Sequence, residues 1–104
     1  MLKHNINGDT LTVMYSGDID HHRSIGIRKE TDELIFAHMP KNLVLDFSAV
    51  QFCDSSGIAL VLGRYKIIKE LGGQIEIVNT SPQITKIFTL ANLGRIIKIK
   101  AAVS

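Results

Sequence analysis

The pattern of apolar and polar positions predicts strands that alternate with helices along this chain. Leu43–Phe47 is an apolar run typical of a buried strand, and Ser55–Leu71 carries apolar residues at helical spacing. Gly72-Gly73 then marks the end of that helix. The residues expected on the buried stripe of the helix are Ile58, Val61, Leu62, Tyr65 and Ile68. A strand followed closely by a long amphipathic helix is therefore the predicted centre of the fold.

Before this unit, the pattern predicts a hairpin and a first helix. Lys3–Ile6 and Leu11–Tyr15 are β-prone, and Asn7-Gly8 between them suits a type I′ turn, whose two central residues need positive φ. Helical spacing extends over Ser24–Met39, and Pro40 closes the helix. The face expected to be buried is Ile27, Thr31, Leu34, Ile35 and His38.

After the centre, three more elements are predicted. Gln74–Asn79 reads as a strand, Ser81-Pro82 starts a helix that ends near Leu93-Gly94, and Ile96–Ile99 reads as a last strand. Ser48–Cys53 is expected to be a loop that dips back against the core. The order β-β-α-β-α-β-α-β predicts an α/β fold in one domain, 1–104, with a mixed sheet of four to five strands flanked by helices.

Length and composition agree with a globular domain. The chain has 104 residues, of which 45% are hydrophobic, enough to form a core. It lacks the run of about 18 apolar residues that a membrane helix needs, and Met1–Asn5 does not read as a signal peptide. Cys53 is the only cysteine, so an intrachain disulfide is excluded. We therefore expect a cytoplasmic protein that does not span a membrane.

Charge is distributed unevenly along the chain. Up to Gly63 there are five Lys/Arg and eight Asp/Glu, whereas from Arg64 onward there are seven and two. The basic residues of the second part are scattered singly, without interleaved aromatic residues. This favours a solvated basic surface over direct binding of nucleic acid.

Candidate chemistry centres on Asp54-Ser55-Ser56-Gly57, at the start of the second predicted helix. Unpaired backbone N–H groups and a partial positive charge at a helix N-terminus stabilise anions such as phosphate. The residues alone leave two interpretations open, a capped helix start and a phosphorylatable serine. A hydrolase is disfavoured, because the Gly-x-Ser-x-Gly elbow is absent and no local base is identified.

Two further groups have competing interpretations. Asp20-His21-His22 is either a metal pair or a loop in which Asp20 or His22 caps the first helix; the cap is favoured because adjacent side chains point apart. Cys53 is either a small buried hydrophobe or a redox-sensitive thiol. Neither standard glycine-rich nucleotide motif is present, so we expect no cofactor and no metal.

Four segments together resemble the STAS domain, and within it the anti-sigma factor antagonists of sporulation. They are Gly17–His22, Leu43–Phe47, Phe52–Ile58 and Gly63–Gly73, and Ser81-Pro82 at the start of the next helix strengthens the narrower likeness. The likeness covers nearly the whole chain. It implies that Ser55 accepts a phosphoryl group. It also implies that the partner-binding residues are Asp20, His21, Asp54, Ser55, Ser56 and Gly57.

The resemblance implies a regulatory protein without enzymatic activity. Its partner would be an anti-sigma factor, an ATP-dependent serine kinase that also holds a sigma factor inactive. The unphosphorylated antagonist would bind this kinase and release the sigma factor. Phosphorylation would end the binding, and a PP2C-type phosphatase would reverse it.

Other interpretations stay open beside this one. The chain could be an interaction module of a general-stress or scaffold pathway, or a small enzyme or nucleotide-binding protein that uses the Ser55 loop. Family members usually continue into a C-terminal helix after the last strand, for which this sequence leaves no room. We therefore expect an apolar surface around Ile97 and Ile99 that is exposed or covered by a partner.

Overall fold

The computed structural model describes residues 2–103, so Met1 and Ser104 lie outside the described residues. Its elements follow the predicted order. They are β1 (Leu2–Asn7), β2 (Thr10–Ile19), α1 (His21–His38), β3 (Asn42–Cys53), α2 (Ser55–Glu70), β4 (Gln74–Thr80), α3 (Pro82–Leu90), the short 3-10 helix η1 (Leu93–Arg95) and β5 (Lys98–Ala101).

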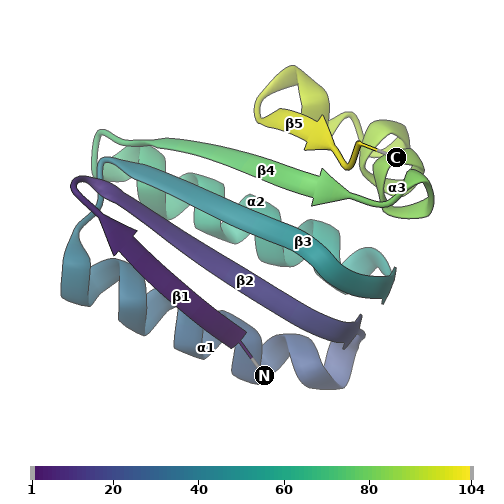
Figure 1. Cartoon of the computed structure of the whole chain (residues 1–104), viewed down its shortest axis with the longest axis horizontal. Helices are drawn as coiled ribbons and strands as arrows, with labels where there is room; N and C mark the ends of the chain where they lie inside the picture. Colours follow the sequence, from purple (N-terminus) through teal and green to yellow (C-terminus); the bar gives the residue numbers. More distant parts are fainter. Residues whose placement is uncertain (1, 104) are drawn as a thin grey trace.

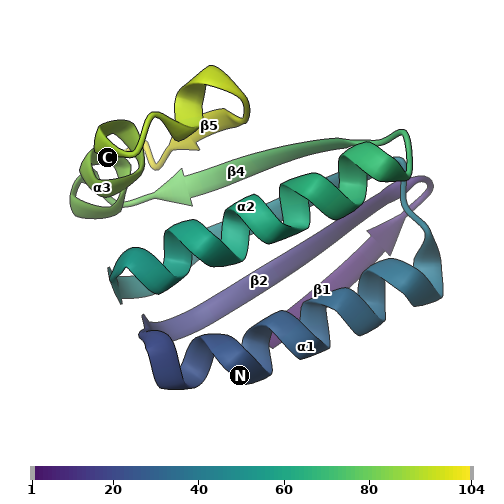
Figure 2. The same ribbon diagram turned by 180° about the vertical axis from the view of Figure 1, so that it is seen from behind.

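The five strands form one mixed sheet in the order β1-β2-β3-β4-β5. β1 pairs with β2 antiparallel, and the other three pairings are parallel. Both long helices, α1 and α2, lie against the same face of the sheet, behind it in Figure 1 and in front of it in Figure 2. Because β2 and β3 run in the same direction, the helices that follow them begin at the same edge of the sheet.

The core lies between the sheet and this helical layer. β2 alternates as predicted, with Leu11, Val13 and Tyr15 buried. Tyr15 contacts Phe47 of β3 edge-on at a ring separation of 5.5 Å, and Phe47 contacts Phe88 of α3 in the same manner at 5.4 Å. A row of aromatic rings thus joins β2, β3 and α3, with geometry that aromatic pairs prefer.

The hairpin turn lies one residue later than predicted. β1 continues through Asn7, which pairs with Thr10, so Gly8 and Asp9 are the two turn residues. Gly8 has φ 61°, but Asp9 is not among the residues with positive φ. The prediction of a type I′ turn is therefore wrong. Glycine at the first central position fits a type II′ turn.

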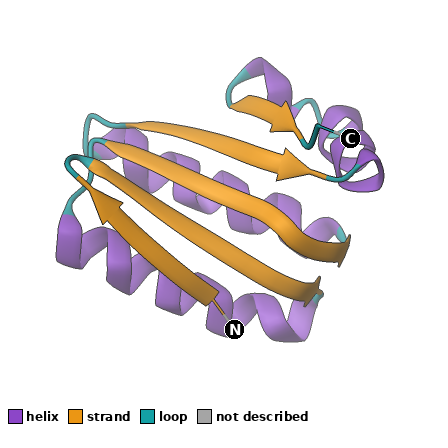
Figure 3. Ribbon diagram, in the orientation of Figure 1, coloured by secondary structure: helices purple, strands orange, loops and turns teal. Residues whose placement is uncertain are grey.

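The prediction of a loop over Ser48–Cys53 is also wrong. These residues extend β3, which Figure 3 shows as one continuous strand up to the edge of the sheet. The reason is the length of β2, whose second half offers partners: Gly17 pairs with Val50 and Ile19 with Cys53. The irregular register between Met14 and Ser16 hides this extension from a simple alternation pattern.

Helix boundaries and buried faces differ in detail from the prediction. α1 begins three residues earlier, at His21, and its last residue, His38, is exposed instead of buried. α3 ends at Leu90, and Leu93 and Gly94 belong to η1. In α2 the fully buried residues are Gly57, Leu60, Val61, Arg64 and Ile68, while Ile58, Leu62 and Tyr65 are half-buried.

The expected apolar surface at the last strand does not include Ile97, although the neighbouring Ile96 is 48% exposed. The strand begins later than predicted, at Lys98, because η1 turns the chain inward first. Ile97 is 2% exposed and joins the core, and Ile99 packs against the core from its margin. Among residues 2–103, no helix is both long and apolar enough to cross a membrane.

Candidate functional site

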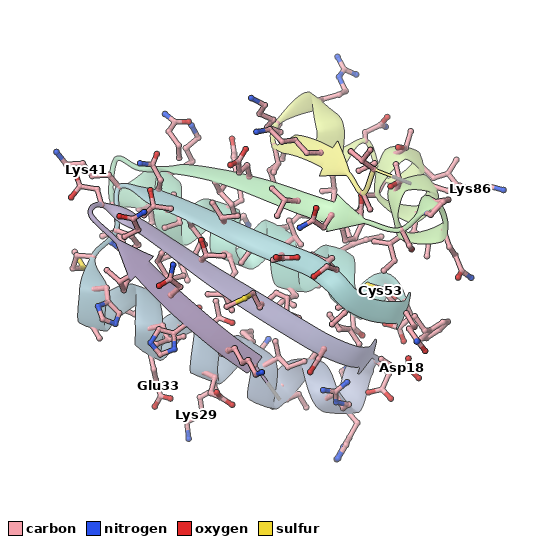
Figure 4. The ribbon with its side chains drawn as sticks, in the orientation of Figure 1. Asp18, Lys29, Glu33, Lys41, Cys53 and Lys86 are labelled. Atoms are coloured by element: carbon pink, nitrogen blue, oxygen red, sulfur yellow. The ribbon has the colours of Figure 1, made fainter. Side chains whose placement is uncertain are left out.

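Two helix N-termini lie side by side at one edge of the sheet. Ile19 ends β2 and Cys53 ends β3, and these two residues are register partners. The backbone N–H of Asp54 donates to the carbonyl of Ile19 at 3.2 Å, which joins the two strand ends. α1 starts two residues after Ile19 and α2 two residues after Cys53. Figure 4 shows Asp18 and Cys53 near this common edge.

An aspartate caps each of these helices. Asp20 Oδ1 accepts a hydrogen bond from the backbone N–H of Arg23 at 2.8 Å, and Asp54 Oδ1 accepts one from Ser56 N–H at 2.8 Å. Of the two predicted caps for α1, Asp20 is therefore the one used, and His22 is not. Each carboxylate compensates an unpaired donor of the first turn.

Ser55 and Ser56 differ in exposure. Ser55 is the first residue of α2 and is exposed, and its hydroxyl makes no hydrogen bond within the part of the chain that the structure describes. Ser56 is half-buried and lines a groove between the two long helices. Of the two hydroxyls, that of Ser55 is the more accessible to a macromolecule.

Gly57 and Cys53 form a close packing pair beneath the first turn of α2. A Cβ atom built on Gly57 would lie 1.8 Å from Cys53 Sγ, far inside van der Waals contact. Gly57 is buried, and its N–H donates to the carbonyl of Asp54 at 3.0 Å. Glycine at this position is therefore a steric requirement of the turn that presents Ser55.

The structure places Cys53 as a buried group. The side chain is 1% exposed, and burial, followed by the charge of Asp54, raises the pKa of its thiol to about 11. The thiol is therefore protonated near neutral pH, and the thiolate needed for redox chemistry is scarce. The packing interpretation of Cys53 agrees with this environment.

Arg23 organises the corner between β2 and α1, a role that the sequence did not suggest. Its Nη2 donates to the carbonyl of Ser16 at 3.0 Å, and its Nη1 donates to the carbonyl of Asp18. Gly17 between them has φ 79°, and a Cβ there would lie 2.9 Å from Arg23 Nη1. One guanidinium thus holds the loop that leads to Asp20.

A second missed feature is an ion pair between the long helices. Arg64 of α2 is 4% exposed, and its Nε lies 2.7 Å from Asp32 Oδ1 of α1. Loss of water raises the pKa of Asp32, and the charge of Arg64 opposes this effect. The signal was present: Arg64 falls four residues after Leu60 and four before Ile68, on the buried stripe.

The predicted site residues gather at one edge. Asp20, His21, Asp54 and Ser55 flank the two helix starts, Ser56 enters the groove, and Gly57 is buried behind them. His21 and His22 are exposed in the first turn of α1. No group of three or more metal-ligating side chains occurs within residues 2–103.

The chain belongs to the STAS domain family, whose model matches residues 2–104. Among its relatives is the anti-sigma F factor antagonist of Paenibacillus polymyxa, which is 36% identical over 89 residues, covering 86% of this chain and 76% of the relative. The anti-sigma-B factor antagonist of Bacillus subtilis is 27% identical over 95 residues, or 91% and 85% of the two chains.

The fold matches two solved structures of the antagonist SpoIIAA, each with 28% sequence identity. The unphosphorylated form superposes with a TM-score of 0.82 and covers 95% of this chain and 87% of its own. The phosphorylated form, from Bacillus, gives a TM-score of 0.74 with coverage of 95% and 90%. This chain is therefore similar, over nearly its whole length, to a protein solved in two phosphorylation states.

Proposed function

We propose that this chain is an anti-sigma factor antagonist whose activity is controlled by phosphorylation of Ser55. In this account the unphosphorylated form binds an anti-sigma factor that is also a serine kinase, and the bound sigma factor is released. The kinase then phosphorylates Ser55, and the antagonist dissociates. The likeness to anti-sigma F factor antagonists and to both forms of SpoIIAA supports the proposal.

The observation that carries the assignment is the exposed, unbonded hydroxyl of Ser55 at the start of α2. A kinase must bring this oxygen in line with the γ-phosphorus of ATP, which requires access from outside. The hydroxyl of Ser56 is less accessible because its residue is half-buried in the groove. Access therefore favours Ser55 over its neighbour.

The fold can accept a phosphate at this position. A phosphoserine carries about −1.5 to −2 charge at neutral pH, and a helix N-terminus stabilises such charge by about 0.3–1 kcal/mol. Asp54 opposes it, because two unit charges about 4 Å apart repel by about 1 kcal/mol in water and by about 4 kcal/mol at a surface-like dielectric. The stabilisation by the helix N-terminus and the repulsion by Asp54 offset one another in part. We therefore expect the protein to stay folded when Ser55 is phosphorylated.

A docked partner would not accept the same phosphate. Its interface would have to bury or face about two additional negative charges, and like charges across an interface cost several kcal/mol. Each 1.4 kcal/mol weakens binding about tenfold. Phosphorylation of Ser55 would therefore act as a gate on binding.

We assign the docking surface to the edge that carries both helix starts. Asp20, His21, Asp54 and Ser56 surround Ser55 there, and Gly57 supports the turn from below. The resemblance to STAS antagonists also points to a PP2C-type phosphatase that removes the phosphate. Ser55 would then be a reversible switch and not a catalytic nucleophile.

The test is phosphoryl transfer in a purified system. The wild-type chain, Ser55→Ala and Ser56→Ala are incubated with the anti-sigma factor kinase and ATP, and intact mass and site are measured by mass spectrometry. We expect one phosphoryl group on wild type and Ser56→Ala, and none on Ser55→Ala. Full phosphorylation of Ser55→Ala would refute the site.

The likeness to anti-sigma-B factor antagonists favours one alternative, a general-stress pathway with the same switch. Partner identity separates the two. A pull-down of each anti-sigma factor with its sigma factor would show which sigma factor this chain releases.

A further inference from the structure

A groove of about 230 Å³ runs between α1 and α2, beside the proposed phosphorylation site. Ser56, Ala59 and Leu60 form its wall on α2. The wall on α1 is formed by His21, Ser24, Ile25 and Arg28. The first turns of α1 and α2 thus form the mouth of this groove. Both lie at the edge of the sheet to which we assign docking of the anti-sigma factor.

The groove is cationic, because no carboxylate lines it. Arg28 has no ion pair within the described residues 2–103, whereas the nearby Asp32 is held by Arg64 at 2.7 Å. At the mouth, Asp20 and Asp54 direct an oxygen toward backbone N–H groups of their own helices. Arg28 also attracts Asp32 and repels Arg64, so these two guanidinium groups share one carboxylate and the trio carries one net positive charge.

Size and lining restrict what the groove can receive. Pockets for drug-sized ligands occupy about 300–1,000 Å³, so this groove is too small for a nucleotide. Ile25, Ala59 and Leu60 provide apolar walls that suit methylene groups. An aspartate or glutamate side chain fits both parts of the groove. Its methylene groups can contact the apolar walls, and its carboxylate can accept two parallel hydrogen bonds from Arg28.

We propose that Arg28 receives an acidic side chain of the anti-sigma factor in this groove. The inference rests on the proposed function, since the partner is the same. This contact would also explain locally why phosphorylation of Ser55 weakens binding. A phosphate on Ser55, next to Ser56 at the mouth, places negative charge in the path of the incoming carboxylate and repels it.

The experiment measures binding of the full chain to the anti-sigma factor by calorimetry at two salt concentrations. The variants are Arg28→Ala and Arg28→Glu, with Lys29→Glu as the matched control. Lys29 is the next residue of α1, is exposed, and extends outward from the helix (Figure 4). Thermal unfolding of every variant verifies that folding is retained.

We expect Arg28→Ala to weaken binding by about tenfold to a hundredfold, the range for a charge-assisted hydrogen bond, and Arg28→Glu to weaken it further. Lys29→Glu should remain within about twofold of wild type. Added salt should weaken wild type more than Arg28→Ala, because an exposed charge pair is screened.

Three results would overturn the inference. One is unchanged affinity in both Arg28 variants, and another is binding by Arg28→Glu as tight as wild type, which would indicate a basic or neutral occupant. The third is Arg28-dependent binding of inorganic phosphate by the free chain, which would make the groove a small-anion site. If wild type itself fails to bind any anti-sigma factor, the proposed function fails instead.

Discussion

The sulfur of Cys53 occupies the space in which a side chain at residue 57 would begin. A Cβ atom on Gly57 would lie 1.8 Å from Cys53 Sγ, so the last residue of β3 and the first turn of α2 are fitted to each other. The distance leaves no room for adjustment by a few tenths of an ångström. The position of the turn that carries Ser55 therefore depends on this pair.

Gly57→Ala should destabilise the protein by about 1–3 kcal/mol, the usual cost of overpacking a core. The matched control is Gly63→Ala in the same helix, where an added Cβ has no atom within 4 Å. That variant should gain about 0.5–1 kcal/mol, because alanine is the better helix former. Urea unfolding measures both free energies.

A double variant distinguishes the steric cause from other effects. Cys53→Ala removes the sulfur, so Cys53→Ala/Gly57→Ala should be more stable than the sum of the two single effects predicts. Strict additivity, or a Gly57→Ala protein as stable as wild type, would show that the pair does not constrain the turn.

Burial of Cys53 predicts a specific loss of stability at alkaline pH. The folded-state pKa is about 11, whereas an unfolded thiol has a pKa of about 8.5. The unfolded chain therefore loses its proton first, and the contribution of the neutral thiol is complete below about pH 8.5 and falls as pH rises to 11. From the linkage relation, the total is on the order of 3 kcal/mol.

Comparison of wild type with Cys53→Ala isolates this effect from other groups that titrate above pH 9. The difference in unfolding free energy between the two proteins should be constant from pH 6 to about 8. Between pH 8 and 11, wild type should lose stability relative to Cys53→Ala. A difference independent of pH would contradict the buried thiol. Thiol-reactive reagents should likewise modify Cys53 only after unfolding.

The cap at Asp54 combines a hydrogen bond with a charge, and two substitutions separate them. Asp54→Ala loses the bond to Ser56 N–H and should cost about 0.5–2 kcal/mol. Asp54→Asn keeps an acceptor and should stay close to wild type. Asp54→Asn also removes the negative charge next to Ser55. Phosphorylation should therefore reduce the stability of Asp54→Asn less than it reduces the stability of wild type, or increase it more.

Thermal unfolding of phosphorylated and unphosphorylated proteins measures this difference directly. If phosphorylation changes the melting temperature of wild type and Asp54→Asn by the same amount, Asp54 does not repel the phosphate.

Local rules were sufficient to predict much of the fold. Alternation located the buried face of β2, and Ser81 caps α3 with Pro82 in its first turn, as their types predict. Asp20 and Asp54 are both caps because each precedes a helix with its carboxylate in reach of backbone N–H groups. These features depend on neighbours in sequence.

Features that depend on distant partners escaped prediction. The end of β3 is a strand only because β2 is long enough to pair with it, at positions such as Ile19 and Cys53. The position of Arg64 on the buried stripe of α2 was visible in the sequence, but its counter-charge, Asp32, is 32 positions away and could not be identified. The groove likewise requires α1 and α2 to lie side by side, which spacing within one helix cannot reveal.

The most direct test of the account is the affinity of the anti-sigma factor for the two forms of this chain. The protein phosphorylated on Ser55 and the unphosphorylated protein are purified separately and titrated against the same anti-sigma factor, with Ser55→Ala as the form that cannot be modified. We expect tight binding by the unphosphorylated protein and by Ser55→Ala, and binding weaker by at least about a hundredfold after phosphorylation. Equal affinity of the two wild-type forms would contradict it.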